Sequence, residues 1–378
     1  MKTFNTIKFL TVSIIASSLL VGCGGGGSST TTNSNSITIS GVASDPELQG
    51  AKIYLDINAN GQLDTNEINT TTKIDGSYTL TIPKEDIGKS IIVEGGLDKV
   101  TKEPFTGKLT MIATQDITNN ISPITTLVEQ YHMEKPDVDI SQIEADIATS
   151  LDISVNDLYK DITKEGNEAL LSIALHLEKV AQLVNDNSQD IQDNIEVYQK
   201  IATKLKVEQN ITNAIDGIAE DIFSGNALAK AKILDLNKEL SNYTTEISTN
   251  SYTKEEIALS IDNIGAKIDE AQTETDLDED LYNDTNLIIT TPQKVEETQR
   301  DNIYKLLGLD SLSSEDKDAL TQKLQDKGVD FKTASATTIL DTIKQPGFFS
   351  LDEIALSKRI LGAIHIDAKL TASVNIGG

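Results

Sequence analysis

Apolar and polar residues alternate in short runs between residues 37 and 93. A period of two is typical of a strand with one buried face. The runs that show it are residues 37–42, 51–55, 77–82 and 90–93, and Gly, Pro and Asp lie between them. Short strands separated by turn residues indicate an antiparallel sheet, and we expect a small β-sandwich here.

The period of the apolar residues changes to 3.6 beyond residue 125, which is typical of helices with one buried face. The clearest stripes lie in residues 170–184, 191–205, 211–222 and 257–271. Ser141, Thr253 and Ser350 are each followed three residues later by Glu, which is capping-box spacing and predicts three helix starts. We expect the stripes to be buried in an intramolecular bundle, although they could also serve as partner-binding faces.

These periods predict an α+β chain, with a small N-terminal antiparallel β-sandwich followed by a larger all-α helical bundle region. The β-domain is expected at residues 37–122 and the bundle at residues 123–290. A boundary near Thr290-Thr291-Pro292 leaves a small C-terminal helical region at residues 291–378. The first 36 residues have neither period and need a separate explanation.

Residues 1–22 have the composition of an export signal. Lys2 and Lys8 are followed by an apolar stretch that is too short to span a bilayer as a stable helix. The stretch ends in Leu20-Val21-Gly22-Cys23, which resembles the lipobox of bacterial lipoproteins. In that family the signal is removed before the cysteine, and the cysteine is acylated. Residues 23–36, rich in Gly, Ser and Thr, would then form a flexible tether.

Cys23 is the only cysteine of the chain. It cannot form an internal disulfide, and Cys-based zinc or iron–sulfur sites are excluded. We therefore expect Cys23 to be the point of lipid attachment, where several acyl chains would hold the protein durably at a membrane. Gly24, where an aspartate would suggest inner-membrane retention, favours the outer membrane. The periplasmic face and the cell surface both stay open.

A full set of calcium ligands follows the second predicted strand. Residues 56–67 fill the pattern D-x-[DN]-x-[DN]-G-x5-E at every constrained position, with Gly61 at the bend. Calcium takes six to eight hard oxygen ligands, and alternate residues of a tight loop can direct theirs to one point. The predicted ligands are the side chains of Asp56, Asn58, Asn60, Asp64 and Glu67 and the backbone carbonyl of Gln62.

The sequence around this loop does not suit the helices of an EF-hand. Ile53 and Leu55 alternate with polar residues before the loop, and a Thr-rich segment follows it. We therefore predict an EF-hand-like loop between two strands, with an Asn/Gly/Asp-rich turn without metal as the alternative. Three carboxylates suit an affinity on the order of 10⁻⁵ to 10⁻³ M, that of a permanent stabilising ion outside the cytoplasm.

Several segments around the loop also carry a resemblance. They are Ile39-Ser40-Gly41-Val42-Ala43, residues 50–56, Asp75-Gly76-Ser77-Tyr78 and Gly95-Gly96-Leu97-Asp98. Together with the loop they resemble bacterial cell-surface modules of the serine-aspartate-repeat B type, and they are similar to carboxypeptidase-regulatory-like (prealbumin-like) sandwiches. The resemblance covers about a quarter of the chain and implies a calcium-stiffened, displayed module. The helical remainder resembles no family that we can name.

Composition narrows the functions that the chain can have. With 59 acidic and 32 basic residues, its net charge is −27, so it would repel a phosphate backbone and no nucleic-acid partner is expected. Neither H-E-x-x-H nor G-x-S-x-G occurs, and we do not expect an enzyme. His176 lies within an apolar stripe and is expected to be a partly buried structural histidine.

The sequence therefore predicts a calcium-binding cell-envelope lipoprotein whose β-domain presents a helical interaction domain, for adhesion or surface binding. Its expected partners are the membrane, through the lipid anchor, and an unidentified protein or surface polymer. A periplasmic envelope-assembly or scaffold lipoprotein is the alternative. An exported hydrolase, or an accessory to one, is a third and less favoured interpretation.

Overall fold

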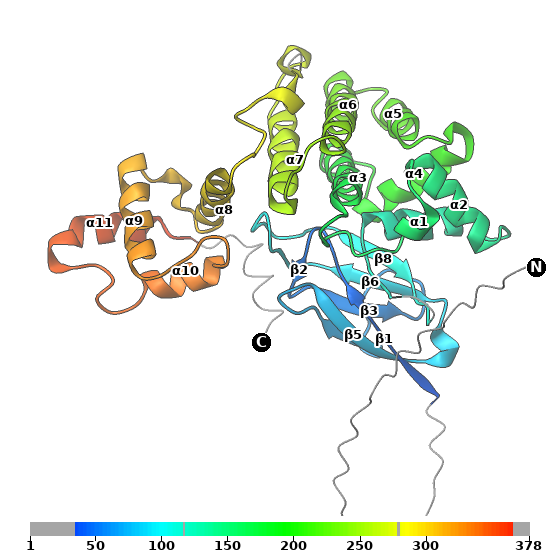
Figure 1. Ribbon diagram of the computed structural model, residues 1–378, viewed down its shortest axis with the longest axis horizontal. Helices are drawn as coiled ribbons and strands as arrows, with labels where there is room; N and C mark the ends of the chain where they lie inside the picture. Colours follow the sequence, from blue (N-terminus) through cyan, green and yellow to red (C-terminus); the bar gives the residue numbers. More distant parts are fainter. Residues whose placement is uncertain (1–34, 116–117, 278–279, 366–378) are drawn as a thin grey trace, which may run out of the picture. The chain divides into compact units, whose positions relative to one another are not determined.

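The computed structural model describes residues 35–115, 118–277 and 280–365 (Figure 1). Within these ranges an N-terminal set of antiparallel strands is followed by eleven α-helices, so the predicted α+β class is confirmed. The signal peptide, Cys23 and the tether up to residue 34 lie outside the described residues.

The strands form three antiparallel sheets. Two of the sheets are pairs: β1 (Ser36–Val42) with β5 (Ser77–Pro83), and β2 (Leu48–Gln49) with β7 (Leu97–Asp98). The third sheet has the order β4 (Asn69–Thr71), β3 (Lys52–Asp56), β6 (Ser90–Glu94) and β8 (Lys108–Ile112). The four predicted strands correspond to β1, β3, β5 and β6, and β2, β7 and β8 were not predicted.

Alternation along the strands decides which side chains enter the core of the β-region. In β5, Tyr78, Leu80 and Ile82 are buried, while the two threonines between them are exposed. They belong to the same hydrophobic cluster as Ile53 of β3 and Val93 of β6. Leu48 of β2 belongs to this cluster too, so residues of all three sheets share one core, and the sandwich itself stays a prediction.

A larger hydrophobic core joins the first helices. It contains residues of α1 (Pro123–Glu134), α2 (Ile140–Ser150), α3 (Glu168–Asn187), α4 (Asn194–Glu208), α5 (Ile211–Ile222), α6 (Ala227–Ile247) and α7 (Lys254–Asp269). The four stripes expected from the sequence lie mainly in α3, α4, α5 and α7. Most of their apolar residues are buried within this core, and Ile173, Ile211 and Ile222 are partly buried against it.

The last helices have a hydrophobic cluster of their own. They are α8 (Pro292–Leu306), α9 (Ser314–Asp326), α10 (Ala336–Ile343) and α11 (Ile354–Ala363). Val295 of α8 belongs to the larger core, whereas Ile303 and Tyr304 of the same helix belong to this cluster. Among the helices of the described residues, none combines the length and the apolar character needed to cross a bilayer.

Two of the three predicted helix starts are confirmed. Thr253 and Glu256 form the expected capping box at α7. Ser350 starts a 3-10 turn (Leu351–Glu353) that leads directly into α11, and Glu353 accepts a hydrogen bond from the backbone N–H of Ser350 (2.8 Å). The start at Ser141 is wrong, because α2 begins earlier, with Asp139 as its N-cap. The Asp139 carboxylate accepts from both the N–H and the hydroxyl of Ser141 (2.9 and 2.6 Å), so Ser141 already lies inside the helix.

Helix α1 is joined to strand β8 by buried hydrogen bonds. The backbone N–H of Thr110 donates to the hydroxyl of Thr126 (2.9 Å), and the hydroxyl of Thr125 donates to the carbonyl of Thr110 (3.1 Å). Thr125 also completes a capping box with Ser122 at the start of the helix. The first helix after the sheet is thereby fixed against its edge strand.

His176 is a buried histidine of the helical core. Its Nε2 lies 3.0 Å from Oδ1 of Asn237 on α6, and the Asn237 amide donates to the carbonyl of Thr212 (2.9 Å) and to Asp216 (2.8 Å). Burial lowers the pKa of His176 to about 4. The folded chain therefore holds this imidazole in its neutral form, in agreement with a structural role.

Acid should destabilise the chain through His176. Because its folded pKa of about 4 lies below the ordinary value of about 6.5, the unfolded state binds more protons between those values. This contribution to stability is complete above about pH 6.5 and is lost as the pH falls. Between pH 7 and pH 5 the wild type should lose about 2 kcal/mol more unfolding free energy than His176→Gln, measured by urea denaturation. His365→Gln, at an exposed position, is the control, and equal losses for wild type and His176→Gln would contradict the prediction.

Candidate metal centre

The loop between β3 and β4 contains the six residues predicted to bind calcium. Strand β3 ends at Asp56 and β4 begins at Asn69, so strands rather than helices flank the loop, as expected. Gly61 has a φ of +70°, in the left-handed region that favours glycine. The sharp bend that the motif assigns to this residue is present.

Two buried carboxylates hold the loop closed. Asp56 is 5% exposed, and its carboxylate accepts from the N–H groups of Gly61 (2.7 Å) and Asn60 (3.2 Å). Glu67 is also 5% exposed, and its two oxygens accept from the N–H groups of Ile57 (2.8 Å) and Asp64 (3.0 Å). Glu67, the last residue of the loop, is thus bonded to Ile57, which directly follows the first residue, Asp56.

The three predicted ligands in the middle of the loop also meet one another. The side-chain amides of Asn58 and Asn60 donate to the same oxygen of Asp64, over 2.7 and 3.0 Å. The oxygen of the Asn60 amide accepts from the N–H of Gln62 (2.8 Å), whose carbonyl is the remaining predicted ligand. Amide nitrogens therefore lie against the carboxylate, where calcium would need oxygens.

The donor set fits calcium by its chemistry, but its present arrangement is not that of a bound ion. In residues 35–115, 118–277 and 280–365, no group of three or more His, Cys, Asp or Glu side chains is placed so that it could hold a metal ion. In the loop, Asp56 and Glu67 face backbone amides. For calcium to bind, Asn58 and Asn60 would have to turn their amide oxygens, in place of their nitrogens, toward an ion beside Asp64. All the predicted donors are hard oxygens, which calcium prefers. Calcium binding by this loop stays a prediction.

Two lysines bind carbonyls of the loop that are not predicted ligands. Nζ of Lys108, on β8, donates to the carbonyl of Gly61 (2.8 Å), and Nζ of Lys89 donates to that of Ile57 (3.2 Å). Lys89 is also paired with Asp86 at 3.0 Å. The loop is therefore anchored at two points from outside, and neither lysine occupies a ligand position.

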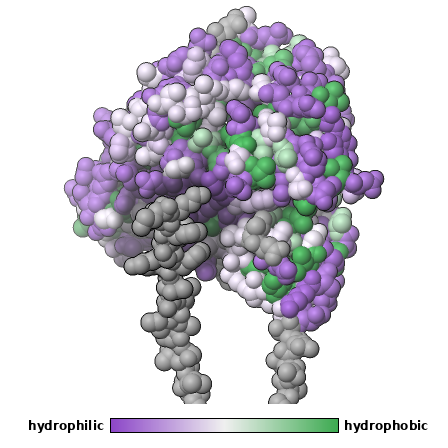
Figure 2. Space-filling view, turned by 45° about the vertical axis from the view of Figure 1, so that its right-hand side comes forward, coloured by the Kyte–Doolittle hydropathy of each residue, from purple (hydrophilic) through white to green (hydrophobic). Residues whose placement is uncertain are grey.

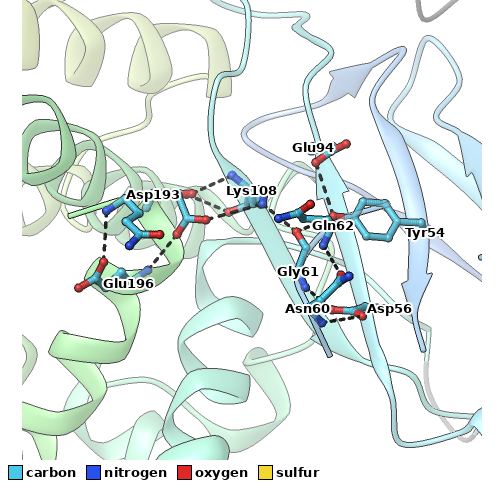
Figure 3. A network of polar contacts seen from close by, with 11 residues as sticks. Tyr54, Asp56, Asn60, Gly61, Gln62, Glu94, Lys108, Asp193 and Glu196 are labelled. Carbon is cyan, nitrogen blue, oxygen red and sulfur yellow. Dashed lines mark hydrogen bonds and ion pairs between the residues drawn. The ribbon is translucent and has the colours of Figure 1, made fainter. Parts of the chain in front are cut away.

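Lys108 connects the loop to the start of α4, and Figure 3 shows this network. Its Nζ lies 3.6 Å from the carboxylate of Asp193, the N-cap of α4. The side chain of Asn194 bonds the backbone of Lys108 twice, accepting from its N–H (2.8 Å) and donating to its carbonyl (2.9 Å). A continuous chain of polar contacts thus runs from Gly61 to the helical region.

Tyr54 adds a second contact to the Gly61 carbonyl. Its hydroxyl donates to that oxygen over 3.1 Å, beside the Lys108 ammonium (Figure 3). Burial raises the pKa of Tyr54 above its ordinary value, and the carboxylates of Glu94, Asp56 and Glu67 raise it further. The hydroxyl therefore keeps its proton and acts as a donor.

Loss of the Asn194 contact should weaken the joint between β8 and α4. Asn194→Ala would leave the N–H and C=O of Lys108 without their partner, and each orphaned group costs about 1–3 kcal/mol. We expect the unfolding free energy to fall by about 2–4 kcal/mol. The control is Asn213→Ala at an exposed position of α5, which should stay within about 0.5 kcal/mol of the wild type. A loss for Asn194→Ala no larger than that of the control would show that the contact does not stabilise the fold.

In comparisons with known proteins, no protein-family model, curated protein or solved structure matches the chain. The resemblance of the β-region to serine-aspartate-repeat B-type and carboxypeptidase-regulatory-like modules therefore stays a prediction. Functional conclusions depend on the loop and its surroundings.

Proposed function

We propose that the chain is a calcium-binding cell-envelope lipoprotein, in which a calcium-stiffened β-domain presents the helical region to a protein or surface-polymer partner. The observation that supports this most is the closed loop itself, with its link through Lys108 to the start of α4. An ion that ordered the loop would also fix the Gly61 carbonyl, and through it the contact with α4.

The charges of the loop give calcium a physical role. Asp56, Asp64 and Glu67 are three carboxylates of one short loop, two of them buried. Like charges held close together repel, and burial makes each of them more costly. A divalent cation among them would neutralise most of that charge, which favours the closed loop in the calcium-rich medium outside the cytoplasm.

The surface of the helical region is consistent with polar recognition. Most apolar residues of the stripes of α3, α4, α5 and α7 are buried in the common core, which leaves little of these stripes free to bind a partner. Hydrophilic residues cover most of the face drawn in Figure 2, with smaller hydrophobic areas between them. A partner of this acidic protein would therefore be recognised mainly through polar groups, as expected for a surface polymer or a polar protein surface.

Calcium should stabilise the purified mature chain, and the effect should depend on Glu67. For an affinity on the order of 10⁻⁵ to 10⁻³ M, calcium at about 1 mM adds about 0.4–2.7 kcal/mol to the unfolding free energy. Glu67→Gln should lose most of this gain, measured by thermal melting with and without EDTA. The matched control is Glu94→Gln. It also replaces a glutamate by glutamine near the loop, beside Tyr54, but removes no predicted ligand, so this variant should keep the stabilisation by calcium. A wild-type melt that is indifferent to EDTA would disprove calcium binding.

The location of the chain separates the preferred function from the periplasmic scaffold alternative. Protease added to whole cells should cleave a displayed chain but leave a periplasmic one intact. Cys23→Ser should release the chain from the membrane fraction, because the acyl chains contribute about 0.8 kcal/mol for each buried methylene. Full protection in intact cells, with cleavage after the outer membrane is opened, would favour the scaffold. A Cys23→Ser chain that stays in the membrane fraction would contradict the lipid anchor.

A further inference from the structure

Helix α11 has apolar side chains on two faces. Its inner face packs into the cluster of the last helices through Ile360, which is fully buried, and through Leu356 and Ala363, which are partly buried against it. A surface helix normally has one apolar face, with polar residues on the opposite side. The apolar side chains on the outside of α11 therefore need a separate explanation.

The outer apolar side chains are those of Leu351, Ile354 and Leu361, which are 90%, 53% and 46% exposed. Leu351 belongs to the 3-10 turn that leads into α11, and spacings of three and seven residues put all three side chains on one side of the helix. Eight large apolar side chains are exposed in the described part of the chain, and these are three of them. Apolar side chains grouped on a surface mark a contact with another segment or molecule. We call this surface the outer face of α11.

The residues that follow α11 have apolar side chains at every second position. A period of two is typical of an extended segment with one apolar face. Residues 366–376 lie outside the described residues, and the apolar ones are Ile366, Ala368, Leu370, Ala372, Val374 and Ile376. The residues between them are Asp367, Lys369, Thr371, Ser373 and Asn375. The sequence therefore places a segment with one apolar face directly after a helix with an exposed apolar face.

The last described residues put the start of this segment beside α11. The N–H of His365 donates to the carbonyl of Leu307 (3.1 Å), and a Cβ added to Gly308 would lie 2.2 Å from Nδ1 of His365. The chain is thus fixed against the end of α8 as it leaves α11. A shallow hollow with a volume of about 660 Å³ lies next to this point, and its lining includes Gly362 and Ala363 of α11. The segment therefore begins at a hollow in the surface of the same helix.

Residues 366–376 are long enough to cover the outer face. An extended chain advances about 3.3 Å per residue, and an α-helix advances about 1.5 Å. The four steps from Ile366 to Leu370 span about 13 Å, and the eight steps from Gly362 back to Ile354 span about 12 Å. A path antiparallel to α11 therefore brings Leu370 opposite Ile354.

We propose that residues 366–376 pack along the outer face of α11 as an extended segment antiparallel to the helix. Their apolar side chains cover Leu351, Ile354 and Leu361. The contact is driven by the removal of apolar surface from water on both sides. The polar side chains of the segment then replace this apolar face as the surface of the C-terminal helices, in agreement with a partner that is recognised through polar groups. The contact does not depend on calcium.

Disulfide trapping in the mature chain tests this contact. Cys23→Ser removes the only native cysteine, and Ile354→Cys with Leu370→Cys then places one thiol on the outer face and one in the segment. We expect a disulfide to form within one chain, measured by the loss of free thiols under mild oxidation. The control pair is Asp310→Cys with Leu370→Cys, because Asp310 is exposed and lies near the start of the segment, two residues after Gly308.

The rates of the two reactions decide the outcome. A docked segment should form the first disulfide about tenfold faster than the control disulfide, because docking raises the effective concentration of one thiol near the other. An equal or slower rate would overturn the proposal. Disulfides between two chains of the Ile354→Cys variant would show that a second copy covers the face, which would also overturn it. Ile354 and Asp310 are exposed, so neither substitution should change the thermal melt under reducing conditions.

Removal of residues 366–378 gives an independent readout. The outer face would then be uncovered, and the fluorescence of the apolar dye ANS should rise at least about twofold. Serine at Leu351, Ile354 and Leu361 of the truncated chain should abolish the rise. Val207→Ser, at a 78% exposed position of α4, is the control and should keep it. Truncation without a rise, or a rise that the three serines do not abolish, would overturn the proposal.

Discussion

The closure of one loop by two buried carboxylates is the interaction on which the proposed function depends. Asp56 and Glu67 bind four backbone N–H groups between them, so both ends of the loop are fixed before any ion is considered. That closure presents the Gly61 carbonyl to Lys108. Because Lys108 also contacts the residues that start α4, the geometry of the loop and the position of that helix are coupled.

The loop could be located from the sequence because its predicted ligands are neighbours along the chain. A fixed spacing of Asp, Asn and Glu around Gly61 needs no knowledge of tertiary structure, and the flanking alternation correctly indicated strands. Lys108 and Asn194 could not be found in this way, since they lie 86 residues apart and meet only after folding. Asp193 could have been predicted as the N-cap of α4, because Asp is a preferred N-cap residue and Asp193 lies at the start of an apolar stripe.

Helix α6, which the sequence did not predict, has a buried face that is not purely apolar. Helix α6 buries Lys232, Asn237 and Glu239 along with its leucines, so its apolar stripe is interrupted. These polar groups are tolerated because they have partners: Asn237 meets His176, Lys232 donates to the carbonyl of Asp269, and Glu239 accepts from the N–H of Tyr282. A pattern that counts only apolar residues cannot anticipate such compensation, which depends on elements far away in the sequence.

The acidic composition of the chain affects its structure most where the acidic side chains are buried. An excess of acids on a solvated surface costs little, but Asp45, Asp98 and Glu178 are buried where the β-region meets α3, and Lys179 is the only Lys or Arg of the described residues that lines the small cavity there. Burial raises the pKa of all three carboxyl groups, and the charge of Lys179 partly offsets this rise in pKa for Asp45 and Glu178. The joint between the β-region and the bundle therefore balances its buried acids with one lysine and with protons, because solvent does not reach them.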